Sequence, residues 1–233
     1  LSGEFGNSFP KTTLFSSFAR SLVKDVDPIS EPDVALLKWF DMDEKLFFLM
    51  EENIVKERLQ QGFVENGEVN VKMFINFSLS VQNRRKSRAG YSLENHICAL
   101  LDANGIEYSH TPVTENRSKP DFLFPNIECY RNMDFNAENL TMLGAKSTCK
   151  DRWRQVLAEA DRIDRKHLLT LEAAISTYQT DEMQDKHLQL VVPQQIHCTY
   201  TENQRQWLYS VADFLDEIKE KQRKTPYAAM LRL

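Results

Sequence analysis

Residues 141–171 read TMLGAKSTCKDRWRQVLAEADRIDRKHLLTL, and this stretch decides the fold. Strand-like runs at 141–146 and 167–171 stand on either side of a segment whose apolar residues recur at helical spacing. Those residues are Trp153, Val156, Leu157, Ala160 and Ile163. Because two strands joined by a helix almost always form a right-handed parallel crossover, the stretch predicts a sheet with a helix packed on one face.

Further elements flank this unit. Strand-like runs lie at 106–110, 121–124, 127–130 and 188–192, and Pro125-Asn126 is expected to turn the second of them into the third. Apolar residues at helical spacing predict helices through the first 80 residues, from Leu93 to Ala103, and from about Trp207 to Ile218. We therefore expect an α/β fold, a mixed sheet flanked by helices, with a helical N-terminal extension.

Composition narrows the class of protein. With 233 residues, of which 42% are hydrophobic, the chain can bury a sizeable core. Its apolar runs are shorter than the roughly 20 residues that span a bilayer, and no signal-peptide pattern is visible, so we expect a cytoplasmic protein with no membrane partner. Four scattered cysteines lack zinc-ligand spacing and are expected to be reduced thiols. Because the sequence begins with Leu1, we expect a fragment of a longer protein.

Charge is segregated along the chain. The net charge of −5 argues against nucleic acid as a partner, since phosphate contacts need cations. Residues 25–70, however, hold twelve acidic and four basic side chains, whereas residues 146–166 hold seven basic and four acidic ones. Four of the five residues from Arg84 to Arg88 are basic. Because of these local basic segments, nucleic acid is still a candidate partner despite the negative net charge.

A set of residues suits phosphodiester hydrolysis. That reaction needs carboxylates to hold Mg²⁺ and a cation to orient water and offset the developing charge. Asp121 opens one strand and Lys146 ends another. The second acid of common nucleases lies two residues before the lysine, but Gly144 stands there. Glu159, which we expect inside the following helix, could fold back to replace it, with Glu94 as a fourth member.

The segment after Lys146 suits base recognition. Lys150 and Arg152 can donate hydrogen bonds to guanine O6 and N7, and Asp151 can accept one from cytosine N4. Such a triplet favours a G·C-rich target.

Four motifs together give a resemblance to a known family. They are Arg84-Arg-Lys-Ser-Arg-Ala-Gly90, Ser92-Leu-Glu94, Lys119-Pro-Asp-Phe-Leu-Phe-Pro125, and 146–155 followed by Glu159-Ala-Asp161. The stretch from Arg84 to Pro193 resembles the catalytic domain of EcoRII-like type II restriction endonucleases, of the PD-(D/E)XK superfamily. The resemblance implies a central mixed five-stranded sheet, with the second acid moved from a strand to a helix.

The resemblance also implies roles for residues. Asp121, Lys146 and Glu159 would form the catalytic set, with Mg²⁺ held by Asp121 and Glu159, and Glu94 would be an additional acid. Lys150, Asp151 and Arg152 would read the outer G·C pairs of a CCNGG- or CCWGG-like pseudo-palindrome. Relatives act as dimers, so the resemblance implies a homodimer on double-stranded DNA in the cytoplasm of a prokaryotic cell.

Two segments keep competing interpretations. Arg84, Arg85, Lys86 and Arg88 form either a solvated charged loop or a segment that grips DNA phosphates, and the resemblance favours the second. Trp39 and Phe40 either pack in a helical core, which the apolar spacing favours, or stack on a base that is flipped out of the duplex. We expect a helical region at 1–82, a nuclease core at 83–222 and a tail at 223–233.

Three functions fit these features. The first is a site-specific, Mg²⁺-dependent DNA endonuclease. The second is a structure-specific repair or junction nuclease on the same fold, and the third is a sequence-specific DNA-binding protein without catalysis. The intact acids and lysine disfavour the third, and the recognition triplet disfavours the second.

Overall fold

The protein is described by a computed structural model, which covers residues 8–149 and 152–224. By its internal contacts the chain forms two units, one of residues 1–25 and 38–96 and one of residues 26–37 and 97–233. The boundary expected after residue 82 falls inside a continuous helix, α4 (Val71–Ala103). Among the residues the model covers, no helix has both the length and the apolar character needed to cross a bilayer.

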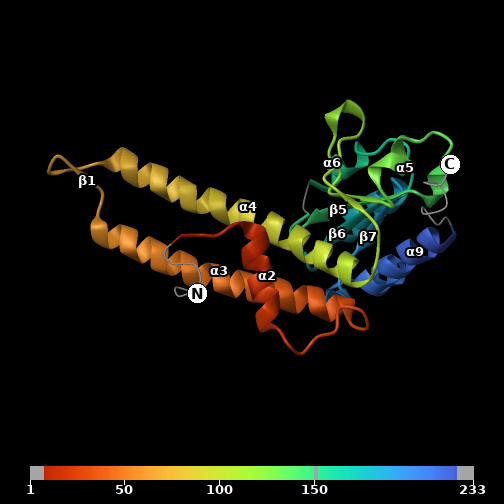
Figure 1. The fold of residues 1–233 in the computed structure, drawn as a ribbon, viewed down its shortest axis with the longest axis horizontal. Coiled ribbons are helices and arrows are strands. Elements are labelled where there is room, and N and C mark those ends of the chain that lie inside the picture. The colour runs from red at the N-terminus through yellow and green to blue at the C-terminus, as the bar shows by residue number, and fades with distance from the viewer. Residues whose placement is uncertain (1–7, 150–151, 225–233) are drawn as a thin grey trace. The chain divides into compact units, whose positions relative to one another are not determined.

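The first unit is helical, as predicted. It contains α2 (Thr12–Leu22), most of α3 (Pro32–Gln61) and most of α4, with a short antiparallel hairpin of β1 (Val64–Glu65) and β2 (Glu68–Val69) between α3 and α4 (Figure 1). Asn66 and Gly67 turn the hairpin with positive φ angles of 53° and 85°. The apolar core of this unit comprises Phe15, Ala19, Leu46, Phe47 and Met50.

The second unit is built on the predicted mixed sheet of five strands. They are β3 (Ser109–His110), β4 (Phe122–Phe124), β5 (Thr141–Lys146), β6 (Lys166–Thr170) and β7 (Leu188–Val191), in that spatial order. The pairs β3–β4 and β4–β5 are antiparallel, whereas the pairs β5–β6 and β6–β7 are parallel. The expected parallel connection through a helix is therefore confirmed, with α6 (Trp153–Leu157) between β5 and β6.

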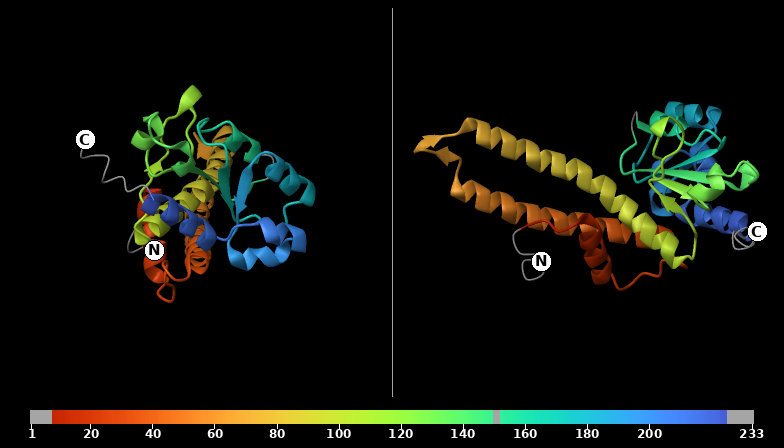
Figure 2. Two further views of the ribbon diagram at one scale, coloured as in Figure 1. Left: turned by 90° about the vertical axis from the view of Figure 1, so that its right-hand side faces the viewer. Right: turned by 45° about the horizontal axis from the view of Figure 1, so that its top comes forward.

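Helices cover both faces of this sheet (Figure 2). On one face, Met142 and Leu168 share a core with Trp153 and Val156 of α6 and with Met183 of α7 (Thr177–Asp185). On the other face, Phe214 of α9 (Val211–Lys224) lies 5.7 Å, ring centre to ring centre, from Phe124 and 5.2 Å from His167. The described residues also form the short helices η1 (Glu115–Arg117), α5 (Ile127–Arg131), η2 (Ala137–Asn139), η4 (Gln194–Thr199) and α8 (Glu202–Trp207).

Two local predictions were wrong. Residues 127–130, expected as a strand, form α5, because the side chain of Asn126 accepts a hydrogen bond from the amide of Cys129 and so caps a helix. The helix expected to run from Trp153 to Ile163 ends at Leu157. Ala160 adopts φ 52°, which breaks the helix although Ala160 and Ile163 are buried as expected.

Candidate active site

Asp121 and Lys146 meet at the carboxyl end of β5. In the antiparallel pairing of β4 and β5, Phe122 lies opposite Leu143, which brings Asp121 beside the last residues of β5. One carboxylate oxygen, Oδ2, accepts a hydrogen bond from the Ala145 amide at 2.7 Å and lies 2.8 Å from the ammonium of Lys146. Both side chains are partly exposed, at 13% and 22%. The two residues that the sequence placed at strand ends are thus brought together.

Gly144 leaves no room for an acid on β5. A Cβ atom added there would lie 2.8 Å from Cγ2 and 3.3 Å from Cγ1 of Val156 on α6. Val156 is fully buried, so it cannot swing into solvent. The side chain that common nucleases place at this position is therefore replaced by a close approach of α6 to the strand.

Glu159 lies just beyond α6 and not inside it. The sequence placed this residue two turns into a longer helix, but α6 ends at Leu157, and the amide of Glu159 donates to the carbonyl of Val156 at 3.2 Å in the turn that follows. Burial, and then the nearby charge of Asp121, raise the pKa of Glu159 to about 7, while Lys146 and Lys166 act in the opposite direction. The sequence predicted Glu159 inside a helix that follows Lys146, whereas the structure places it in the turn after a shorter helix.

The pKa of Glu159 makes the stability of the metal-free protein depend on pH. Since the folded-state pKa is raised above the usual glutamate value of about 4.5, the folded protein binds a proton that the unfolded chain has released between about pH 4.5 and 7. Stability is therefore lost as the pH rises through this window. We expect Glu159→Gln to have a higher Tm than wild type at pH 8 in EDTA and a nearly equal Tm at pH 4.5.

Thermal unfolding at the two pH values checks this expectation, with Glu138→Gln as the control because Glu138 is exposed. A Tm difference for Glu159→Gln that is the same at both pH values would show that the Glu159 carboxyl does not titrate in this range.

The site suits a divalent cation bound by oxygen ligands. Two carboxylates close enough for one charge to raise the pKa of the other repel each other, and a cation between them would relieve that repulsion. Mg²⁺ is usually held by one or two carboxylates and keeps several water ligands. Within residues 8–149 and 152–224 no group of three or more Asp, Glu, His or Cys side chains is placed to hold a metal. The pair of Asp121 and Glu159 as metal ligands stays a prediction.

The recognition triplet is only partly visible. Lys150 and Asp151 lie outside the described residues. Arg152 is exposed, just before α6, and its guanidinium donates to the backbone carbonyl of Thr148 at 3.2 Å and to the Thr148 hydroxyl at 3.4 Å. The adjacent Trp153 is fully buried, so the segment between β5 and α6 is anchored at its end while Arg152 faces solvent.

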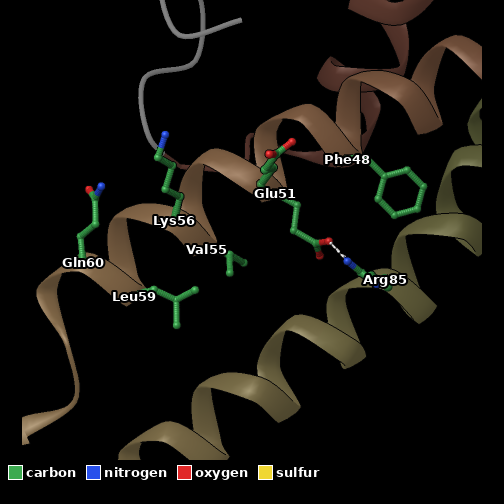
Figure 3. A pocket seen from close by; sticks show the side chains of 8 residues that line it. Phe48, Glu51, Val55, Lys56, Leu59, Gln60 and Arg85 are labelled. Atoms are coloured by element: carbon green, nitrogen blue, oxygen red, sulfur yellow. Dashed lines mark hydrogen bonds and ion pairs between the residues drawn. The ribbon is translucent and has the colours of Figure 1, made fainter.

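The basic segment from Arg84 to Arg88 is part of α4, so the loop interpretation was wrong. Arg88 is 5% exposed and donates to Asp43 at 3.2 Å. Arg85 pairs with the buried Glu51 at 2.6 Å, an ion pair that joins α3 and α4 in Figure 3. The guanidinium of Arg84 lies 4.9 Å from the ring centre of Phe9.

These contacts correct one predicted role. A guanidinium as buried as that of Arg88 cannot reach a phosphate, so we do not propose a DNA contact for it. Arg85 and Lys86 are exposed, and for them a phosphate contact stays a prediction.

Three other predicted residues lie in the helical unit. Trp39 is 6% exposed, and its ring centre lies 6.1 Å from that of His96, which supports the core-packing interpretation. Phe40 is partly buried. Glu94 is partly buried on α4, and its role as an additional acid stays a prediction.

Sequence reasoning missed the residues that surround the Glu159 turn. Glu115 accepts a hydrogen bond at 2.6 Å from the hydroxyl of Tyr130, which is 2% exposed. Arg162 donates to the backbone carbonyls of Tyr130, Asn132 and Phe135. A dense run of acidic and basic residues at 159–166 was the available signal, but a charged run by itself also fits a solvated surface.

Comparison with known proteins settles the family. A family model described as EcoRII C terminal matches residues 47–215. The chain belongs to this family. The type II restriction enzyme EcoRII of Escherichia coli is 42% identical over 189 residues, which are 81% of this chain and 46% of that protein. The chain thus spans about half the length of this curated relative.

Solved structures of restriction endonucleases share the fold of this member of the family. Metal-depleted Ecl18kI in complex with uncleaved, modified DNA aligns with a TM-score of 0.77 and 20% identity, over 96% of this chain and 82% of that one. The complex of restriction endonuclease PspGI with substrate DNA aligns with a TM-score of 0.75 and 16% identity, over 93% and 94%. The predicted restriction-endonuclease fold is therefore confirmed.

Proposed function

We propose that the protein is a Mg²⁺-dependent endonuclease that cuts both strands of DNA at a short, G·C-flanked, CCNGG- or CCWGG-like pseudo-palindrome. The observation that carries this proposal is the contact of Asp121 with Lys146 at 2.8 Å, next to the Glu159 carboxyl. Membership in the EcoRII C-terminal family supports it. We further propose that it acts as a homodimer, because one set of these residues serves one strand of the duplex. We also propose that it acts in the cytoplasm.

The residues of the site divide the chemistry between them. Asp121 and Glu159 would hold Mg²⁺, which supplies a Lewis acid and lowers the pKa of bound water. Lys146 is the cation in contact with Asp121, and its ammonium can orient the attacking water and offset the negative charge that develops on the phosphate. The Ala145 amide fixes the orientation of the Asp121 carboxylate. The β4–β5 pairing therefore preorganises two of the three groups.

Cleavage of plasmids of known sequence tests the proposal. With Mg²⁺ we expect wild type to give discrete cuts whose mapped ends share one G·C-flanked site. Asp121→Ala should give none, and Asp185→Ala, at an exposed acid at the end of α7, should cut as wild type does. Cutting by Asp121→Ala at the same sites would show that the chemistry resides elsewhere, and the absence of cutting by the wild-type chain would favour a DNA-binding protein without catalysis.

Arg152→Ala separates site-specific from structure-specific cleavage. If Arg152 donates to a guanine, its loss should cost about 1–3 kcal/mol of discrimination at that base pair, which is roughly 5- to 150-fold in relative cleavage. Non-specific DNA affinity should fall much less. Competition cleavage of cognate and single-substitution duplexes measures this, with Arg154→Ala as the control because Arg154 is exposed and paired with Glu182 at 2.7 Å. An unchanged preference in Arg152→Ala would favour recognition of DNA structure.

A further inference from the structure

Lys166 is a buried lysine behind the turn that carries Glu159. It is the first residue of β6 and only 8% exposed. Its ammonium donates a hydrogen bond to the backbone carbonyl of Leu157 at 2.7 Å. Leu157 is the last residue of α6 and stands two positions before Glu159. A buried ammonium is costly unless it is hydrogen-bonded and paired, so this contact calls for an explanation.

Acidic groups offset part of the cost of burying this ammonium. Burial lowers the pKa of Lys166 below its usual value, while the charges of Asp161, Asp164, Glu159 and Glu115 act in the opposite direction. Lys166 in turn is one of two cations, with Lys146, that favour the ionised form of Glu159 against burial and the charge of Asp121. Glu159 is therefore flanked by Lys146 at the end of β5 and by Lys166 at the start of β6.

Other contacts of the turn come from neutral groups. The Glu159 amide donates to the Val156 carbonyl at 3.2 Å, and the Ala158 amide donates to the Gln155 carbonyl at 3.2 Å. The Ser118 hydroxyl lies 3.5 Å from the carbonyl of Ala158, at the limit of a hydrogen bond, and Ala160 adopts an uncommon positive φ. The bond from Lys166 is shorter and charged, and hydrogen bonds from charged groups are the stronger kind. We infer that Lys166 is a positioning residue, which fixes the end of α6 through the Leu157 carbonyl and thereby holds the Glu159 carboxylate where it can bind a divalent cation with Asp121.

This inference rests on the proposed Mg²⁺-dependent function, and it concerns metal affinity rather than the chemical step. Residues that orient metal ligands typically contribute 10- to 100-fold to metal affinity. In Lys166→Met, which keeps the length and loses the donor and the charge, we expect the Mg²⁺ concentration for half-maximal cleavage to rise at least about tenfold. The rise in Tm on adding Mg²⁺ without DNA should fall to less than half of the wild-type value. Lys166→Arg, which keeps donor and charge, should recover most of both.

The controls make the inference falsifiable. Lys186→Met, at an exposed lysine in the same unit, should match wild type in both measurements. If Lys166→Met does not fold, Lys166→Gln, whose shorter and neutral amide cannot make the charged hydrogen bond, should shift the Mg²⁺ dependence in the same direction by a smaller amount. A variant that loses Tm in EDTA yet keeps the wild-type Mg²⁺ midpoint would show that Lys166 serves packing alone, which overturns the inference but not the proposed function. If wild type shows neither a Mg²⁺-dependent rise in Tm nor cleavage, both are overturned.

Discussion

Glu159→Ala should abolish DNA cleavage while leaving specific DNA affinity within a few-fold of wild type. Removing one of two carboxylates from the proposed metal site is expected to cost several kcal/mol of transition-state stabilisation, which corresponds to a rate loss of about 10³-fold or more. Glu159 lies in the turn after α6 and has no role in the expected base contacts, which reside in the segment before Trp153. Binding should therefore survive.

The measurement pairs single-turnover cleavage in Mg²⁺ with equilibrium binding to the same duplex in Ca²⁺ or EDTA. Glu138→Ala, at an exposed acid on η2, is the control and should cleave normally. Full activity in Glu159→Ala would refute the assignment of the second carboxylate to this turn. A parallel loss of binding and cleavage would instead point to a role in folding or in contacting DNA.

The strands around the site could be predicted because their sequence signals are local. Pro120-Asp121 before an apolar run and Lys146 after another mark strand ends, and the structure brings those two residues to 2.8 Å. The run at 127–130 has the same apolar character, but the Asn126 cap and the buried positions Cys129 and Tyr130 make it a helix. A single capping residue thus outweighed β-propensity over four residues.

The ionic contacts of the basic segment were beyond sequence reasoning. The sequence of residues 84–88 does not show that Arg88 pairs with Asp43, 45 positions away, or that Arg85 pairs with Glu51. A run of arginines is equally compatible with a surface that meets phosphate and with a helix whose charges are neutralised by another helix. The acidic excess at residues 25–70 was the complementary signal, since it supplied both partners.

The place of Glu159 depends on a long-range contact. The sequence shows that Gly144 cannot supply a carboxylate, but not why the position is a glycine. In the structure the missing side chain is what allows Val156 to approach β5, and Glu159 follows three residues later. Gly144 and Glu159 are therefore parts of one arrangement, in which β5 lacks an acidic residue and the turn after α6 carries one.

Gly144→Ala should consequently impair cleavage although it adds only a methyl group. The new Cβ would lie 2.8 Å from Cγ2 of Val156 and 3.5 Å from Cδ1 of Leu168, so α6 must shift away from β5. Overpacking of this kind costs typically 1–3 kcal/mol of stability. A displacement of about 1 Å at a catalytic group can cost roughly 10²-fold in rate. We expect a lower Tm and a cleavage rate reduced by about that factor, measured at saturating Mg²⁺ and DNA.

Val156→Ala supplies the test of this mechanism, because it removes both atoms that the new methyl group would meet. In the double variant Gly144→Ala/Val156→Ala, cleavage and Tm should exceed the values expected from adding the two single effects, as for residues in direct contact. Gly90→Ala is the matched control, since a Cβ at Gly90 meets no atom within 4 Å and alanine is favoured in a helix. Additive losses in the double variant would mean that Gly144 matters for a reason other than the packing of the Val156 side chain against it. Rescue would establish that the packing of α6 against a glycine on β5 determines where the second carboxylate stands.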